Sequence, residues 1–142
     1  MKKVIILLIA TLLISCQTEF GKFDEDKDFI YGICYDYETD ENGYYIITFE
    51  RQLKLNNNEL RVRSELAEKS KNTKYHNYFY TLMKMKYDFA NDRSCLVSYT
   101  DYDVDDKVID SFTAPRDHFE EVKATELYYV AAKRLVYDSK NK

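Results

Sequence analysis

Three aspartates at alternate positions form a cluster of side chains whose spacing could support chemistry. One residue separates Asp101 from Asp103, and one separates Asp103 from Asp105. Alternate carboxylates can converge on a hard cation, so this spacing would suit Ca²⁺. The same spacing is also typical of a charged turn that limits strand pairing at the edge of a sheet.

The spacing resembles the opening of an EF-hand calcium loop, but the rest of the segment departs from that family. The sixth position of the loop is normally glycine and is Asp106 here, and the twelfth is normally a bidentate glutamate and is Phe112. The flanking segments alternate like strands. We therefore favour the charged turn and expect no metal or other cofactor, with the three aspartates as the calcium candidate.

The sequence contains no recognisable catalytic motif. It has no Gly-x-Ser-x-Gly and no phosphate-binding loop, and its three glycines are isolated. His76 and His118 have no partners at the spacing of metal ligands. The chain has 25 Asp and Glu residues, so paired carboxylates are expected by chance. We expect a protein that is not an enzyme, and an enzyme with an unrecognised site is the third alternative for its function.

Tyrosine is the remaining unusual feature, with 14 residues and no tryptophan. Tyrosine suits protein interfaces because it combines a broad ring with a polar tip and few rotamers. Tyrosines on the same strand parity as Ile33, Ile47 and Val97 are expected in the core. Those on the opposite parity are the candidates for an exposed partner-binding surface: Tyr44, Tyr78, Tyr80 and Tyr102.

The amino terminus has the pattern of an export signal. Lys2 and Lys3 precede an apolar run over 4–14, which is too short to span a bilayer. The run ends in Leu13-Ile14-Ser15-Cys16, which resembles the lipobox of bacterial lipoprotein precursors. That resemblance implies cleavage before Cys16, lipid on its sulfur and a lipid-anchored protein of the cell envelope. Gln17, where an aspartate would favour the inner membrane, implies the outer membrane facing the periplasm in a Gram-negative cell.

We expect three parts: a signal peptide over 1–15, an acylated Cys16 with a flexible acidic tether over 16–28, and one globular domain over 29–142. Loss of Lys2 and Lys3 leaves 19 Lys and Arg against 25 Asp and Glu, a net charge of about −6. This charge argues against nucleic acid as a partner and against a basic face that docks on anionic lipid. It suits a basic protein partner.

Two cysteines remain once Cys16 is assigned to the lipid. An exported chain lies where disulfides persist, so we predict that Cys34 and Cys95 form a disulfide. The alternative is two buried thiols.

Period-two alternation dominates the domain. It predicts a hairpin over 29–55 that turns at Asn42-Gly43, followed by strands over 79–89, 95–100 and 108–113. The segment 59–70 fits a strand or a helix, and we favour a strand at its start. Pro115 ends the sheet pattern, and Asp117 with Glu120 predicts the start of a C-terminal helix.

These elements predict an α+β fold: a single antiparallel sheet of five or six strands with one C-terminal helix. A small curled β-barrel is the alternative. For function, we expect a lipid-anchored, non-enzymatic protein of the cell envelope that binds a protein partner, as immunity, inhibitor or exclusion lipoproteins do. The second alternative is an accessory lipoprotein subunit of an envelope secretion or pilus assembly.

Overall fold

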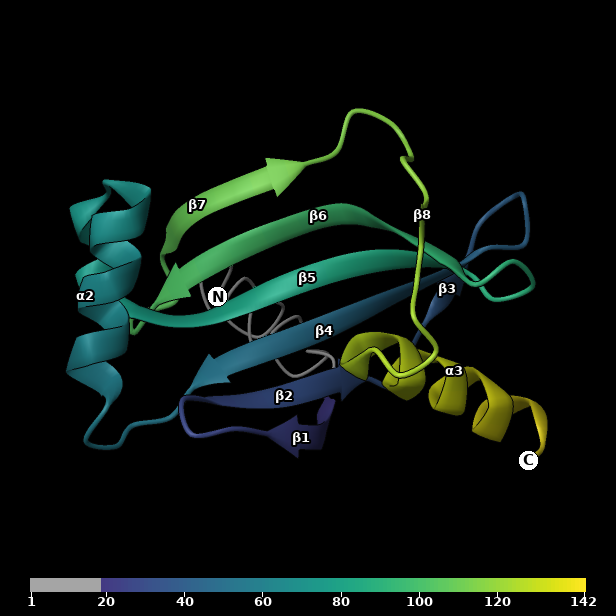
Figure 1. The fold of residues 1–142 in the computed structure, drawn as a ribbon, viewed down its shortest axis with the longest axis horizontal. Coiled ribbons are helices and arrows are strands. Elements are labelled where there is room, and N and C mark those ends of the chain that lie inside the picture. Colours follow the sequence, from purple (N-terminus) through teal and green to yellow (C-terminus); the bar gives the residue numbers. More distant parts are fainter. Residues whose placement is uncertain (1–18) are drawn as a thin grey trace, which may run out of the picture.

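The computed structural model describes residues 19–142 (Figure 1), so the predicted signal peptide and Cys16 lie outside the described residues. These residues form an α+β fold around an antiparallel sheet whose main strands lie in the order β1-β2-β4-β5-β6-β7. The sheet stays open, as the α+β prediction requires, and does not close into the alternative barrel. The six main strands are β1 (Phe20–Glu25), β2 (Phe29–Cys34), β4 (Tyr45–Leu53), β5 (Tyr78–Asp88), β6 (Arg93–Asp103) and β7 (Val108–Thr113).

Two short strands and three helical segments complete the fold of residues 19–142. Strand β3 (Glu38–Thr39) pairs with β4, and β8 (Glu120–Glu121) pairs with β6. The helical segments are α2 (Glu59–Ser70), the 3₁₀ helix η1 (Thr73–Asn77) and α3 (Leu127–Lys140). Among the described residues, no helix is both long and apolar enough to cross a membrane.

The predicted hairpin is present, and β2 and β4 are its two long strands. The short strand β3 lies between them in the sequence and pairs with β4. Gly43 has φ +80°, which glycine adopts without the steric cost that a Cβ would bring. The Asp40 carboxylate accepts hydrogen bonds from the backbone N–H groups of Asn42 and Tyr44. The Asn-Gly pair therefore makes the turn that its sequence predicts.

The strand favoured at the start of 59–70 is wrong, because this segment is the helix α2. Helical spacing brings Arg61 within 3.0 Å of both carboxylate oxygens of Glu65, and buries Val62 and Ala67 on one side. Leu60, which the alternation would place inside, is 73% exposed. Because the segment has few apolar residues, the same sequence fits both periodicities.

The C-terminal helix is confirmed, but it begins at Leu127 and not near Asp117. The Asp117 carboxylate pairs with the Lys86 ammonium at 2.7 Å and caps no helix. Residues 114–126 instead form a strap that carries β8 across the sheet (Figure 1). Helix α3 then buries Tyr129, Ala132 and Val136 against the sheet.

The predicted flexible tether over 16–28 is wrong for Phe20–Glu25, because these residues form strand β1. Phe20 pairs with Cys34, and Gly21 with Ile33, so β1 extends the sheet beyond β2. A Cβ on Gly32 would lie 3.2 Å from the Cβ of Phe20, so glycine allows the two strands to approach closely. The folded domain thus includes Phe20–Glu25 as well as the predicted 29–142.

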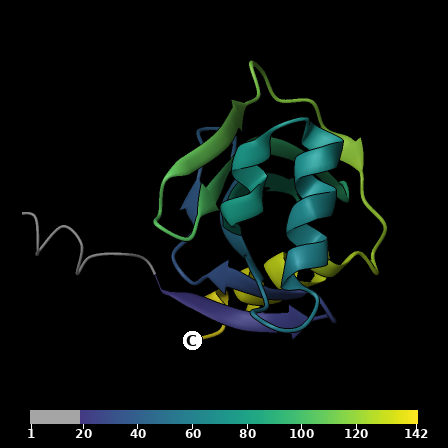
Figure 2. The same cartoon turned by 90° about the vertical axis from the view of Figure 1, so that its left-hand side faces the viewer.

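The core has two centres. One lies between the sheet and α3 and includes Ile47, Phe49 and Tyr87. The other lies at the α2 end and includes Leu53, Val62 and Tyr78. Viewed from the α2 end, the strands form a curved sheet, and the strap with β8 runs down one side of it (Figure 2). We call the side of the sheet that packs on α3 the α3 face, and the other side the opposite face.

Candidate functional site

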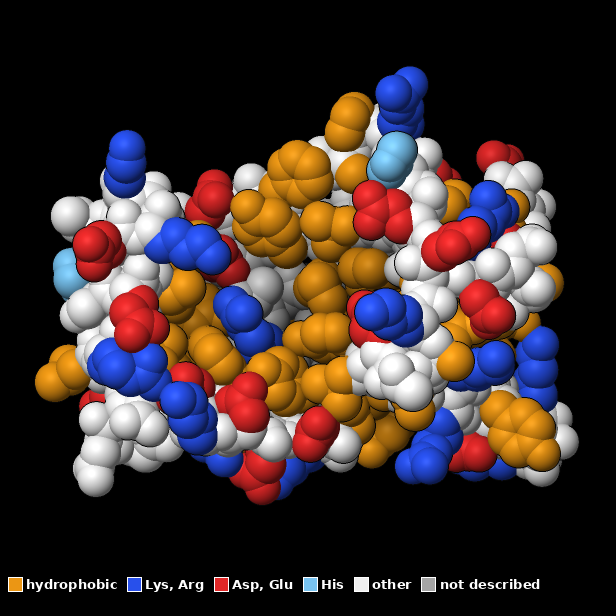
Figure 3. Space-filling view, in the orientation of Figure 1, with side chains coloured by type: hydrophobic (Ala, Val, Ile, Leu, Met, Phe, Trp, Pro, Cys, Tyr) orange, Lys and Arg blue, Asp and Glu red, His pale blue; other side chains and the backbone are white. Residues whose placement is uncertain are grey.

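A groove crosses the α3 face between α2 and α3, with a volume of about 280 Å³. In Figure 3 apolar side chains gather over the middle of this face, between the two helices. The groove is lined by Phe49, Arg51, Thr81, Met83, Leu96, Tyr99, Asp101 and Tyr128. We call it the central groove.

Strand register organises the groove into two parallel rows. Residues directly opposite each other on antiparallel strands share a face, so their side chains lie side by side. The apolar row runs across five strands as Ile33, Phe49, Met83, Tyr99 and Phe112. The polar row runs beside it as Tyr31, Arg51, Thr81, Asp101 and Asp110.

Hydrogen bonds join the polar row into one network. The buried Asp101 carboxylate accepts a hydrogen bond from Tyr75 Oη and another from Thr81 Oγ1, each at 2.5 Å. Thr81 Oγ1 also lies 2.7 Å from Tyr78 Oη, which accepts from Arg51 Nη2 at 3.4 Å. Burial, followed by the Asp101 carboxylate, raises the pKa of Tyr75 well above its usual range.

Arg51 is the cation of this network, and no described carboxylate lies within salt-bridge distance of it. Its guanidinium lies over the Phe29 ring at 4.5 Å, and the buried Nε has no hydrogen-bond partner among the described residues. Burial by itself would lower the pKa of Arg51, but Tyr78, Tyr128 and Asp101 outweigh it and the pKa lies above its usual value. Arg51 is therefore charged and held mainly by aromatic rings.

Tyr128 brings α3 to the groove. Its ring packs edge-on against Phe49 at 4.9 Å and against Tyr31 at 5.9 Å. Burial raises its pKa. At the other end of the apolar row, Tyr99 stacks with Phe112 at 5.8 Å, and Phe112 is 43% exposed. The rings of the row thus extend from Phe49, which packs on Tyr128 of α3, to the exposed ring of Phe112 on the edge strand β7.

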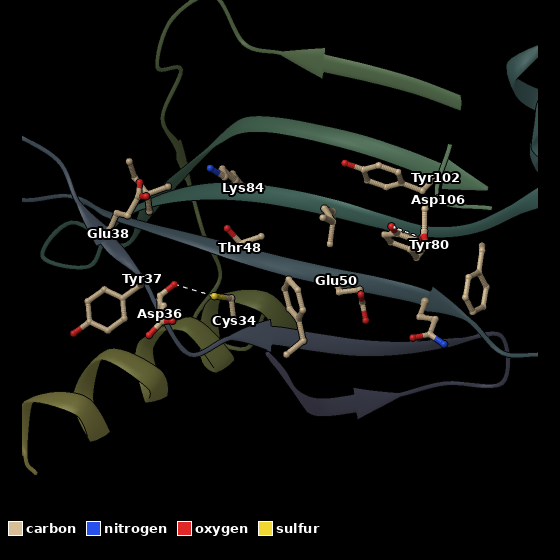
Figure 4. Close-up of a pocket in the computed structure, with 15 residues that line it drawn as sticks. Cys34, Asp36, Tyr37, Glu38, Thr48, Glu50, Tyr80, Lys84, Tyr102 and Asp106 are labelled. Carbon is tan, nitrogen blue, oxygen red and sulfur yellow. Dashed lines mark hydrogen bonds between the residues drawn. The ribbon is translucent and has the colours of Figure 1, made fainter. Parts of the chain in front are cut away.

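The opposite face carries a larger hollow of about 860 Å³ (Figure 4), where two of the predicted partner-binding tyrosines meet. Tyr80 and Tyr102 stack with their ring centres 4.7 Å apart, and Tyr80 Oη donates to Asp106 at 2.9 Å. Glu50 lines the same hollow, and burial raises the pKa of its carboxyl. Tyr44 does not join them, because its ring packs on Phe119 at 5.0 Å.

Tyr78 was expected on the exposed surface with Tyr80, and this is wrong, because Tyr78 is 0% exposed. The register shifts between Tyr78 and Tyr80, where β5 has one more residue than β6. Such a bulge reverses the parity of the strand, so these two tyrosines lie on different faces of the sheet.

The predicted disulfide is also wrong. Cys34 ends β2 and Cys95 lies near the start of β6, with β4 and β5 between them. Three strand spacings of about 4.8 Å place the two residues roughly 14 Å apart, whereas a disulfide needs Cα atoms within about 7 Å. Both are buried, and the Cys34 Sγ donates to the Asp36 carbonyl at 2.9 Å.

The aspartates of the calcium candidate also have separate partners. Asp101 is bonded to Tyr75 and Thr81, while the Asp103 carboxylate accepts from the backbone N–H groups of Asp105 and Lys107. In the part of the chain that the structure describes, no group of three His, Cys, Asp or Glu side chains could hold a metal ion. Asp103 therefore stabilises the turn between β6 and β7, which is the charged turn that the sequence analysis favours.

Sequence reasoning did not single out Arg51, Tyr99, Phe112 or Tyr128. Cross-strand register brings Arg51, Tyr99 and Phe112 to one face, and α3 adds Tyr128. Neither arrangement can be read from a single sequence. Searches for similar proteins found no match to this chain among family models, curated proteins or solved structures.

Proposed function

We propose that this chain is a lipid-anchored, non-enzymatic protein of the cell envelope that holds a protein partner in its central groove. Its anchor would be the acylated Cys16, and its mode of action that of an immunity, inhibitor or exclusion lipoprotein. In a Gram-negative cell it would sit on the outer membrane and face the periplasm. The single observation that carries the proposal is the apolar row that ends in the exposed ring of Phe112.

The apolar row supports a protein partner because its rings are preformed. Tyr99 and Phe112 support each other by stacking, and Tyr128 is fixed edge-on to Phe49. Rigid aromatic side chains lose little conformational entropy on binding, and exposed aromatic patches of this kind mark protein interfaces.

The acidic end of the polar row supports a basic partner. Asp110 lies directly opposite Asp101 on β7 and is exposed. Burial, followed by Asp110 and Asp101, raises the pKa of Tyr99. A lysine or arginine of the partner would meet the exposed Asp110 carboxylate beside the rings of Tyr99 and Phe112, which combines charge pairing with cation–π contact.

The state of the groove's hydroxyl groups supports a role in binding over catalysis. Thr81 and Tyr75 are both bonded to Asp101, and burial keeps the pKa of Tyr75 and of Tyr78 above the usual value. Both phenols therefore stay protonated at neutral pH, and neither acts as a base there.

Affinity purification of the lipidated protein from a detergent extract tests this function. We expect one stoichiometric protein partner, whose recovery falls when Phe112→Ala removes the exposed end of the apolar row. Tyr102→Ala is the matched control, since it removes a stacked ring from the opposite face. Equal recovery with both variants, or no partner at all, would overturn the proposal. Labelling with a palmitate analogue, with Cys16→Ser as control, tests the anchor separately.

A further inference from the structure

A second apolar groove lies where α3 meets the first two strands. Its volume is about 680 Å³, and its walls come from Phe23 and Ile33 on the sheet and from Leu127 and Val130 on the helix. We call it the α3–β1 groove. Apart from Ile33, which begins the apolar row, its lining residues are not part of the central groove.

Several large apolar side chains around this groove are exposed to solvent. Leu127 is 36% exposed and Val130 is 43% exposed, and both lie on the outward side of α3. Tyr35 adds a ring that is 60% exposed and lies across Gly21, where an added Cβ would fall 1.9 Å from its hydroxyl oxygen. Tyrosine rings of this kind favour membrane–water interfaces, where one end is apolar and the other hydrated.

The charged residues that line the groove are mainly cations, although the protein as a whole carries a net negative charge. Lys22, Arg134 and Lys142 line it, with Asp138 as the single acid in the lining. The Lys22 ammonium is partly neutralised by Glu25, at 2.6 Å. The overall acid excess argued against a basic lipid-binding face, but the local arrangement is basic and apolar, as in interfacial helices.

The chain length from the anchor places this groove near a bilayer. Only three residues lie between Cys16 and Phe20, where β1 begins, so the chain takes four residue steps from one to the other. An extended chain spans at most about 3.5 Å per residue, so the start of β1 lies within roughly 14 Å of the lipidated sulfur. Lys22 and Phe23 follow on the same strand, and they form one wall of the groove.

We propose that the α3–β1 groove is a second membrane contact, in which its apolar side chains enter the interface of an anionic bilayer and its cations meet lipid headgroups. This rests on the proposed lipid anchor for its geometry. The contact fixes the orientation of the domain as well as its distance from the membrane. Strand β7 is at the far edge of the sheet from β1, five strand spacings or about 24 Å away. The exposed end of the central groove would therefore point away from the lipid.

Vesicle sedimentation of the mature chain, residues 16–142 with Cys16→Ser, tests the contact without the anchor. We expect binding to vesicles that contain phosphatidylglycerol, weak binding to pure phosphatidylcholine, and a decrease with added salt. Arg134→Glu should weaken binding to the anionic vesicles by about tenfold. Lys84→Glu makes the same charge change on an exposed residue of the opposite face and should have little effect. Equal effects of the two variants, or no preference for anionic vesicles, would contradict the proposed membrane contact. Because the tested chain has no lipid anchor, this result does not depend on whether Cys16 is acylated.

A spin label on the lipidated protein tests the orientation. A label on Val130→Cys should become more accessible to oxygen than to a water-soluble nickel complex in an anionic bilayer. A label on Phe112→Cys should stay accessible to the nickel complex. The same accessibility at both positions would contradict the orientation, even if palmitate labelling establishes the anchor.

Discussion

The Asp101 carboxylate is the centre of the polar row, and its removal should have a large effect on stability. It is 8% exposed and accepts hydrogen bonds from Tyr75 and Thr81 at 2.5 Å. Tyr75 is itself 7% exposed, so its hydroxyl has no ready access to water as a replacement acceptor. Asp101→Ala therefore removes two short hydrogen bonds and leaves a buried donor unpaired.

The size of the loss follows from these contacts. A hydrogen bond to a charged group contributes about 1.5–3 kcal/mol, so Asp101→Ala should lower the free energy of unfolding by roughly 3–5 kcal/mol. Asp101→Asn keeps one acceptor oxygen and should lose about half as much. Asp110→Ala is the matched control, because Asp110 is the exposed neighbour of Asp101 on β7 and should cost less than about 1 kcal/mol.

Urea unfolding of the three variants, followed by far-UV circular dichroism, measures these differences. An Asp101→Ala variant within about 1 kcal/mol of Asp110→Ala would refute the reasoning, because two bonds to a buried carboxylate cannot contribute so little. A loss in Asp101→Asn as large as that in Asp101→Ala would instead show that the charge matters and the hydrogen bonds do not.

Three further predictions concern other parts of the fold. Arg51→Met should lower the urea midpoint modestly, because the fold favours the Arg51 cation and the variant loses the hydrogen bond to Tyr78, and partner recovery should fall; an unchanged midpoint would contradict this. Burial and Asp92 raise the pKa of Tyr129 to about 12, so the unfolded chain loses the phenol proton at a lower pH than the folded chain does. The free energy of unfolding should therefore decrease as pH rises above about 10. Tyr129→Phe should make that decrease shallower in an alkaline titration. Cys34 and Cys95 should not bond to each other, so mass spectrometry of a non-reduced tryptic digest should find no peptide that joins the two. Such a peptide would contradict the separation of β2 from β6.

The strands were predictable where alternation is uninterrupted. The hairpin around Gly43 and the strand over 108–113 are present, because apolar spacing and turn chemistry are local properties. Helix α2 was missed because Leu60 and Val62 fit both periods. Strand β1 was missed because, with only two burial-prone rings in Phe20 and Phe23, its sequence reads as polar and acidic.

The candidate site was harder to predict because two bulges reverse strand parity. One separates Tyr78 from Tyr80 on β5, and the other lies in β6 opposite Lys84 and Met85. Through the second, Cys95 pairs with Lys86 while Tyr99 pairs with Met83, so residues expected on one face lie on two. The two rows of the central groove depend on that register, which is set by packing across five strands and not by local sequence.

Photocrosslinking from position 112 tests the central claim most directly. Replacing Phe112 with benzoylphenylalanine in the full chain places a reactive ring at the exposed end of the apolar row. Irradiation of living cells should give one discrete covalent adduct from this position and none from the same substitution at Tyr102. No adduct at position 112, or the same adduct from both positions, would contradict a partner in the central groove.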